Sequence, residues 1–312
     1  MTVSRRNFCK IPSGLALGAM VAPVPLEAKR RKRRGRPAKR VLIIAFDGIR
    51  VDGLAQAETP NIDALIRSGA ASMSTRDVMP SVTLPNFTSH LTGAGPEVHG
   101  VTDNGWATAH ALPAVVTDED GYFPSVYQAL KTSVPNIKTA YYWNWKPLIG
   151  PINPRYIDDA LFGEKDAFIP LYDRVMSFLS ENRDVPTFTF LYTVHTDHAG
   201  HKYKWMSPEY IAAIEAGDVQ VGRLVAFLKE EGLYDDAHIL FITDHGGIGN
   251  GHGGVSTEEM IVPWVVSGPG IKEGFTISEP NNTVNTAATV LRLFGVEQPL
   301  CWTGEVPESI FL

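Results

Sequence analysis

The sequence contains very little cysteine. Cys9 and Cys301 are the only two among 312 residues. Two cysteines cannot build a zinc–thiolate site, and Cys9 lies in an N-terminal segment that we expect to be removed. A disulfide framework is therefore not expected.

Long apolar runs are also missing. No stretch reaches the roughly 18–20 apolar residues that a membrane-spanning helix needs, so the sequence predicts no transmembrane segment. The composition, with 44% hydrophobic and 20% charged residues, is that of a globular protein. The length allows one large domain or two modest ones.

Basic residues are scarce outside the N-terminal region. Of the 28 Lys and Arg, three lie in residues 1–28 and nine in residues 29–40, so residues 41–312 hold 16, against 33 Asp and Glu. That part of the chain therefore has a net charge of −17. Because a negative surface repels nucleic-acid phosphates, we expect no specific nucleic-acid partner.

The stretch SRRNFCK, residues 4–10, resembles the twin-arginine export motif of bacteria. A short, mildly apolar stretch follows, with Ala28 as a plausible cleavage point. We predict that residues 1–28 are a twin-arginine signal peptide that engages the export machinery and directs the chain to the periplasm or outside the cell. The alternative is an accidental arginine pair in a disordered leader.

Residues 29–40 read KRRKRRGRPAKR. Nine like charges in twelve residues cannot fold alone, so we interpret this segment as a solvated basic tether. Binding to an anionic surface, polyphosphate or nucleic acid is the alternative.

Apolar runs and helical patterns alternate along the rest of the chain. Buried strands are predicted at residues 40–46, 138–143, 187–193, 238–243 and 263–268. Helices are predicted at residues 59–69, 169–180, 208–233 and 285–295. This alternation predicts an α/β fold over residues 41–312, a three-layer α/β/α sandwich around a mostly parallel central sheet.

Three of the predicted strands end near an aspartate: Asp47, Asp197 and Asp244. Sites in such sheets form at the carboxyl ends of strands, although a single aspartate there is often a turn former or a helix cap. Asp197 and His201 are four residues apart, a spacing that places both on one face of a helix.

Two more histidines, His245 and His252, follow the strand that ends near Asp244. Adjacent side chains diverge, so Asp244 and His245 can serve two centres, and the glycines around His252 let the backbone bend close to an ion. Three Asp and three His form the mixed ligand set expected for two zinc ions, which can stabilise both sides of a phosphoryl displacement. A hydrogen-bond network or a solvated loop is the alternative.

Residues 79–93, MPSVTLPNFTSHLTG, supply a candidate nucleophile. Thr83 lies two residues before Pro85, which suits a helix start. A helix N-terminus favours an anion, and a metal on the hydroxyl would favour the alkoxide. The alternative is that Thr83 is only an N-cap.

Five motifs occur in one order across residues 40–295: FDG, TLPNFTSHLTG, EVHGVTDN, DHAGH and TDHGG. Through them the chain resembles the alkaline phosphatase superfamily, most closely its type I phosphodiesterase/nucleotide pyrophosphatase branch. The resemblance implies an alkaline phosphatase-like fold with two Zn²⁺, or Mn²⁺ or another divalent ion. It implies that one ion is held by Asp197, His201 and His252, and the other by Asp47, Asp244 and His245, with Thr83 bridging toward substrate.

Together with the export signal, the resemblance leads us to predict an exported phosphodiesterase or nucleotide pyrophosphatase that cleaves small phosphate esters through a covalent phospho-threonine on Thr83. The Asn104 amide would bind a phosphoryl oxygen, and Trp106 and Lys146 are predicted as further substrate contacts. Leu84 stands where the family often has an aromatic residue that stacks on a nucleobase. The alternatives are a phosphomonoesterase, a sulfatase-like hydrolase and a non-catalytic binding protein.

Overall fold

The computed structural model describes residues 37–106 and 112–312. The predicted signal peptide and residues 29–36 of the predicted basic tether lie outside these ranges. Within them, no helix combines the length and apolar character that crossing a bilayer requires. The last residue of the predicted tether, Arg40, is the first residue of strand β1.

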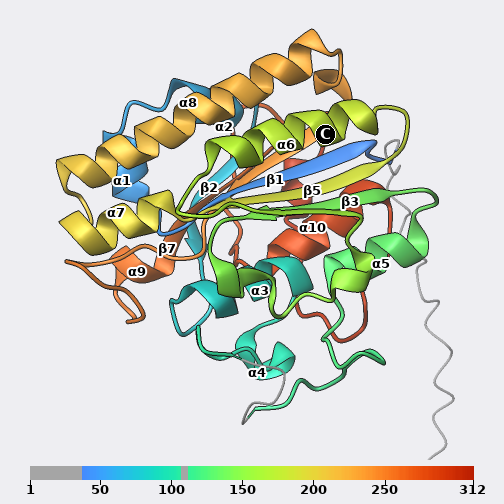
Figure 1. The fold of residues 1–312 in the computed structure, drawn as a ribbon, viewed down its shortest axis with the longest axis horizontal. Helices are drawn as coiled ribbons and strands as arrows, with labels where there is room; N and C mark the ends of the chain where they lie inside the picture. The colour runs from blue at the N-terminus through green and yellow to red at the C-terminus, as the bar shows by residue number, and fades with distance from the viewer. Residues whose placement is uncertain (1–36, 107–111) are drawn as a thin grey trace, which may run out of the picture. The chain divides into compact units, whose positions relative to one another are not determined.

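An eight-stranded sheet lies at the centre of the described structure, in the order β4-β3-β5-β1-β6-β7-β2-β8 (Figure 1). Its strands are β1 (Arg40–Phe46), β2 (Gly69–Arg76), β3 (Lys138–Trp143), β4 (Asp159–Phe162), β5 (Thr187–Thr193), β6 (Ala237–Ile242), β7 (Ile261–Ser267) and β8 (Phe275–Thr276). Strand β7 runs antiparallel to its neighbours β6 and β2, and the other pairs are parallel. The prediction of a mostly parallel sheet is confirmed.

Helices cover both faces of the sheet (Figure 1). One face carries α1 (Val51–Gln56), α2 (Pro60–Arg67), α6 (Ile169–Glu181) and α8 (Pro208–Glu230). The other face carries α3 (Thr83–Thr92), α5 (Val126–Ser133) and α10 (Asn285–Phe294). Successive side chains of a strand point to opposite faces of the sheet. Ile43 of β1 therefore packs in the apolar core on the face that carries α3, and its neighbour Ile44 packs in the core on the face that carries α8. The predicted three-layer sandwich is confirmed.

Seven shorter elements complete the described structure. They are the helices α4 (Pro96–His99), α7 (His195–Tyr203) and α9 (Thr257–Met260) and the 3-10 turns η1 (Lys146–Ile149), η2 (Pro154–Tyr156), η3 (Tyr234–Asp236) and η4 (Glu308–Ile310).

The five predicted strands and four predicted helices are all present, with ends within three residues of the predicted ones. Strand β2 was missed because its sequence, GAASMSTR, is rich in small and polar residues. Strands β5, β1 and β6 are neighbours and run in one direction, so their carboxyl ends meet at one edge of the sheet. That arrangement brings together residues that are up to 205 positions apart in the sequence, from Asp47 to His252.

Candidate metal centre

Three aspartates converge at the edge where β5, β1 and β6 end. Asp47 directly follows β1, Asp244 lies two residues after β6, and Asp197 is in the first turn of α7, which begins two residues after β5. All three are buried. One oxygen of each, Oδ1 of Asp47 and Asp197 and Oδ2 of Asp244, accepts no hydrogen bond within the described residues. Such oxygens are costly to bury without a partner, so the cluster has the character of a cation site.

The other carboxylate oxygens of Asp47 and Asp244 are held by the protein. The Tyr192 hydroxyl donates to Asp47 Oδ2, and the Gly48 amide donates to Asp244 Oδ1 over 3.1 Å. Gly48 has a φ of 73°, a backbone conformation that favours glycine. A Cβ atom at this position would lie 3.1 Å from the Cα atom of Asp197, so glycine also avoids a close contact. These contacts fix the direction in which the free oxygens point.

Three histidines reach the cluster in one tautomer. His245 Nδ1 donates to Gly246 O over 2.8 Å, His252 Nδ1 to Ser81 O over 2.9 Å, and His201 Nδ1 to Asn250 O over 2.8 Å. A carbonyl oxygen can only accept, so each Nδ1 carries a proton, and in the neutral imidazole each Nε2 is the atom with the lone pair. A backbone partner of this kind orients metal-binding histidines in proteins.

The distances between the donor atoms suit a shared ion. His245 Nε2 lies 3.1 Å from Asp244 Oδ2 and 3.4 Å from Asp47 Oδ1, while Asp197 Oδ1 lies 3.4 Å from His201 Nε2 and 3.7 Å from His252 Nε2. Two ligand atoms bound tetrahedrally to one zinc ion at its usual bond lengths are about 3.3 Å apart. In each of two groups the donor atoms lie within 4.8 Å of one another, Asp47, Asp244 and His245 in one and Asp197, His245 and His252 in the other, and their nitrogen and oxygen donors fit a divalent metal. The sixth predicted ligand, His201, approaches Asp197 but is not part of either group.

Burial and mutual repulsion govern the charges of the cluster. Burial, followed by Asp244 and Asp197, raises the pKa of Asp47 well above its usual value. Burial also raises the pKa of Asp244 to about 8, and burial and His252 lower the pKa of His245. Three carboxylates this close cannot all be ionised without a cation, and divalent ions would remove the repulsion.

Thr83 lies beside this cluster. It is the first residue of α3, and Val82 is the N-cap, so the alternative of Thr83 as a mere N-cap does not hold. Its Oγ1 atom is 3.3 Å from His245 Nε2. The amide of Leu84 donates to Asn104 Oδ1 over 2.8 Å, so Asn104 is fixed at the helix start, and its NH₂ group makes no hydrogen bond with the described residues.

The segment before Thr83 is tied to the loop that carries His252. Ser81 accepts from His252 Nδ1 through its carbonyl oxygen, and its hydroxyl donates to Gly254 O over 2.7 Å. The side chain of Asn86 bonds to the backbone of the same segment at Val78. Most of these hydrogen bonds involve backbone atoms, which every residue type has. The sequence alone therefore did not reveal them.

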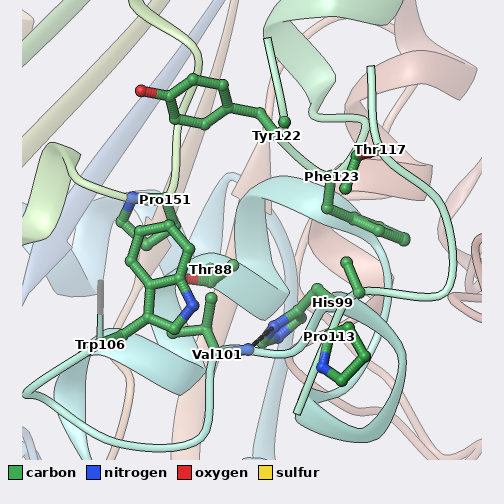
Figure 2. A pocket seen from close by; sticks show the side chains of 11 residues that line it. Thr88, His99, Val101, Trp106, Pro113, Thr117, Tyr122, Phe123 and Pro151 are labelled. Carbon is green, nitrogen blue, oxygen red and sulfur yellow. Dashed lines mark hydrogen bonds between the residues drawn. The ribbon is translucent and has the colours of Figure 1, made fainter. Parts of the chain in front are cut away.

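Trp106 borders a cavity of about 290 Å³ (Figure 2). It lies on one side of this cavity and Phe123 on the other, and Thr88 of α3 also lines it. The exposed Lys146 forms no hydrogen bond or ion pair with the described residues, so no such contact ties it to the metal-ligand side chains.

Two buried side chains near the site were missed by sequence reasoning. Tyr192 lies inside the apolar run of β5, where nothing distinguishes it from a core tyrosine. Asp77 directly follows β2 and is 3% exposed. It is a further strand-end aspartate, and prediction of β2 would have singled it out.

Comparisons with curated proteins identify relatives over two thirds of the chain. An uncharacterized pyrophosphatase/phosphodiesterase of Schizosaccharomyces pombe is 27% identical over 66% of this chain and 44% of its own length. Ectonucleotide pyrophosphatase/phosphodiesterase family member 3 of Mus musculus is 27% identical over 66% of this chain and 24% of its own length. Bis(5'-adenosyl)-triphosphatase ENPP4 of Bos taurus is 26% identical over 66% of this chain and 47% of its own length. The chain spans less than half the length of each relative.

Solved structures share the fold. Murine ectonucleotide pyrophosphatase/phosphodiesterase 5 superposes with a TM-score of 0.74 at 14% identity, covering 89% of this chain and 100% of that chain. A phosphonate monoester hydrolase from Silicibacter pomeroyi gives a TM-score of 0.68 at 17% identity, covering 88% and 76%. The alkaline phosphatase-like fold predicted from the sequence is therefore confirmed.

The model of the family described as type I phosphodiesterase/nucleotide pyrophosphatase matches residues 41–263. This range includes the strand ends, the start of α3 and the His252 loop that together form the cluster. The chain belongs to the type I phosphodiesterase/nucleotide pyrophosphatase family.

Proposed function

We propose that the chain is a two-zinc hydrolase that cleaves phosphate diesters and nucleotide pyrophosphates through a covalent phospho-threonine on Thr83. One observation carries this proposal: unpaired carboxylate oxygens and histidine lone pairs converge beside a threonine hydroxyl at a helix start. Family membership supports the reaction class.

Asp47, Asp244 and His245 would hold one ion, and Asp197, His201 and His252 the other. When bound, such ions supply Lewis acidity at the phosphoryl oxygens and at the Thr83 hydroxyl. The donor set supports zinc because it combines imidazole nitrogen with carboxylate oxygen and lacks sulfur.

The residues around Thr83 define the steps. Thr83 Oγ1 bonds to phosphorus while the bond to the leaving oxygen breaks, and water then releases the phosphoryl group from Thr83. The backbone amide of Thr83 and the NH₂ group of Asn104 donate to the phosphoryl oxygens. The structure of murine ectonucleotide pyrophosphatase/phosphodiesterase 5 supports a threonine nucleophile, because that protein is described as an inactive threonine-to-alanine variant in complex with AMP.

The charge of the site supports a diester substrate. No lysine or arginine in the described ranges forms an ion pair with the six ligand side chains. A diester carries one negative charge and a monoester nearly two, so a site without a firm cationic clamp favours the diester. We expect a higher kcat/KM on a bis-aryl phosphate than on the matching mono-aryl phosphate. An equal or faster rate on the monoester would favour the phosphomonoesterase alternative.

Replacement of the nucleophile separates chemistry from metal binding. Thr83→Ala should keep the metal content of the wild type, because the six other ligands remain, and should lose about 1,000-fold or more in kcat. Thr83→Ser is the matched control, since it retains a hydroxyl, and should keep much more activity. Near-wild-type turnover in Thr83→Ala on every phosphate ester tested would rule out the phospho-threonine.

The Trp106 cavity is proposed to hold the organic group of the substrate, because Trp106 follows the Asn104 phosphate contact by two residues. Trp106→Ala should raise KM for a bis-aryl phosphate by about 3–10-fold, the loss expected for one aromatic contact, with little change in kcat. Trp145→Ala is the matched control, since Trp145 also packs on the core but does not line this cavity. Equal KM values in both variants would remove Trp106 from the substrate site.

The metal-free protein should lose stability as the pH rises from about 6.5 to 8. The pKa of Asp244 is raised from 3.8 to about 8 by burial, so the folded state keeps a proton that the unfolded state has released, and the free energy of unfolding falls with pH. The buried His90 and His195 have pKa values lowered from 6.5 to about 4. They make the free energy of unfolding rise with pH, but only below about pH 6.5, where the unfolded state binds protons that the folded state does not. Thermal unfolding after chelation measures this, and Asp244→Asn should flatten the slope. A melting temperature that rises over this window would contradict the assignment.

A further inference from the structure

Asp77 is a buried carboxylate that the fold leaves without partners. It is 3% exposed, and neither Oδ1 nor Oδ2 accepts a hydrogen bond or joins an ion pair within the described residues. Asp218 of α8, at 1% exposure, shows the usual arrangement, because the amides of Asn61 and Ile62 and the Asn61 side chain donate to it. An unpaired buried carboxylate requires a compensating group.

The topology places Asp77 at the same sheet edge as the metal ligands. Strand β2 is antiparallel to β7, and β7 is antiparallel to β6, so β2 and β6 end on one side. The Asp77 amide donates to Met260 O over 3.1 Å, and the Gly246 amide donates to Glu259 O over 2.8 Å. The carbonyl groups of Glu259 and Met260, at the end of α9, thus bind the backbone of Gly246 and of Asp77. Asp77 is therefore tied to the same short helix as the residue that follows His245.

Within residues 37–106 and 112–312, no lysine, arginine or histidine forms an ion pair with Asp77. Burial raises the pKa of Asp77 to about 9, and the next two causes are the negative charges of Asp244 and Glu259. Glu259 is already engaged, because it accepts from the Gly254 amide and the Ser256 hydroxyl. Arg76 precedes Asp77 in sequence but is exposed and forms no ion pair with any described residue. Without a cation Asp77 would keep its proton at neutral pH, and a cation bound next to Asp244 would favour its ionised form.

We propose that Asp77 is an outer carboxylate of the metal centre, a positioning residue whose negative charge strengthens divalent-ion binding by Asp47, Asp244 and His245. Asp77 does not join the two groups whose donor atoms lie within ligand distance of one another, so it acts on the ion by charge and not by coordination. This inference rests on the proposed metal-dependent function. Outer groups that are hydrogen-bonded to metal ligands typically change metal affinity by about 10–100-fold when replaced, and we expect the Asp77 charge to act at the lower end of that range.

The test is the affinity of stripped protein for Zn²⁺, measured by competition with a chelator in the absence of substrate. Asp77→Asn keeps the size of the side chain and removes its charge, so Zn²⁺ should bind about 10-fold or more weakly. Its metal-free melting temperature should not fall, and the rise on adding Zn²⁺ should be smaller than in the wild type. Asp77→Glu, which restores the charge, should recover part of the affinity.

Asp218→Asn is the matched control. It should lower the melting temperature of the metal-free protein, because it disturbs a fully hydrogen-bonded buried carboxylate, and should leave Zn²⁺ affinity unchanged. If Asp77→Asn does not fold, the smaller Asp77→Ser variant takes its place in the same comparison.

Wild-type Zn²⁺ affinity in a folded, uncharged Asp77 variant would overturn the role of Asp77 and leave the proposed function intact. A wild-type protein that takes up no divalent ion would overturn both. The two failures are distinguished because metal uptake of the wild type and the difference between variants are separate measurements.

Discussion

Repulsion among buried carboxylates is the constraint around which this edge of the sheet is arranged. Asp47, Asp197 and Asp244 are forced together because β5, β1 and β6 are parallel neighbours whose carboxyl ends meet. The protein satisfies one oxygen on Asp47 and one on Asp244 from within and leaves the other unpaired. The sheet therefore stabilises a geometry whose electrostatics a bound cation would complete.

The histidines extend this arrangement beyond the strands. His201, His245 and His252 come from a helix and two parts of one loop, yet each has its Nδ1 proton on a backbone carbonyl. A backbone partner cannot move without moving the chain, so the ring orientations are set by the fold and not by the ion. The cluster is for that reason largely organised before a metal binds.

The sequence predicted the parts of the site that depend on side-chain type next to a recognisable strand. Asp47 and Asp244 were found because β1 and β6 are apolar runs buried on both faces. Asp77 was missed because β2 is built from small and polar residues, and Tyr192 because a hydroxyl inside an apolar strand resembles a core residue. The substrate contact of Lys146 stays a prediction, because its exposed side chain makes no contact within the described residues that fixes its position.

The double attachment of Ser81 to the His252 loop has a mechanical consequence. Ser81 lies two residues before Thr83 and bonds to both His252 and Gly254. A displacement of the last ligand is therefore transmitted through one short stretch of backbone to the first turn of α3. The positions of the His252 ring and the Thr83 hydroxyl are thus coupled through the backbone, so a substitution in the His252 loop would also displace the proposed nucleophile.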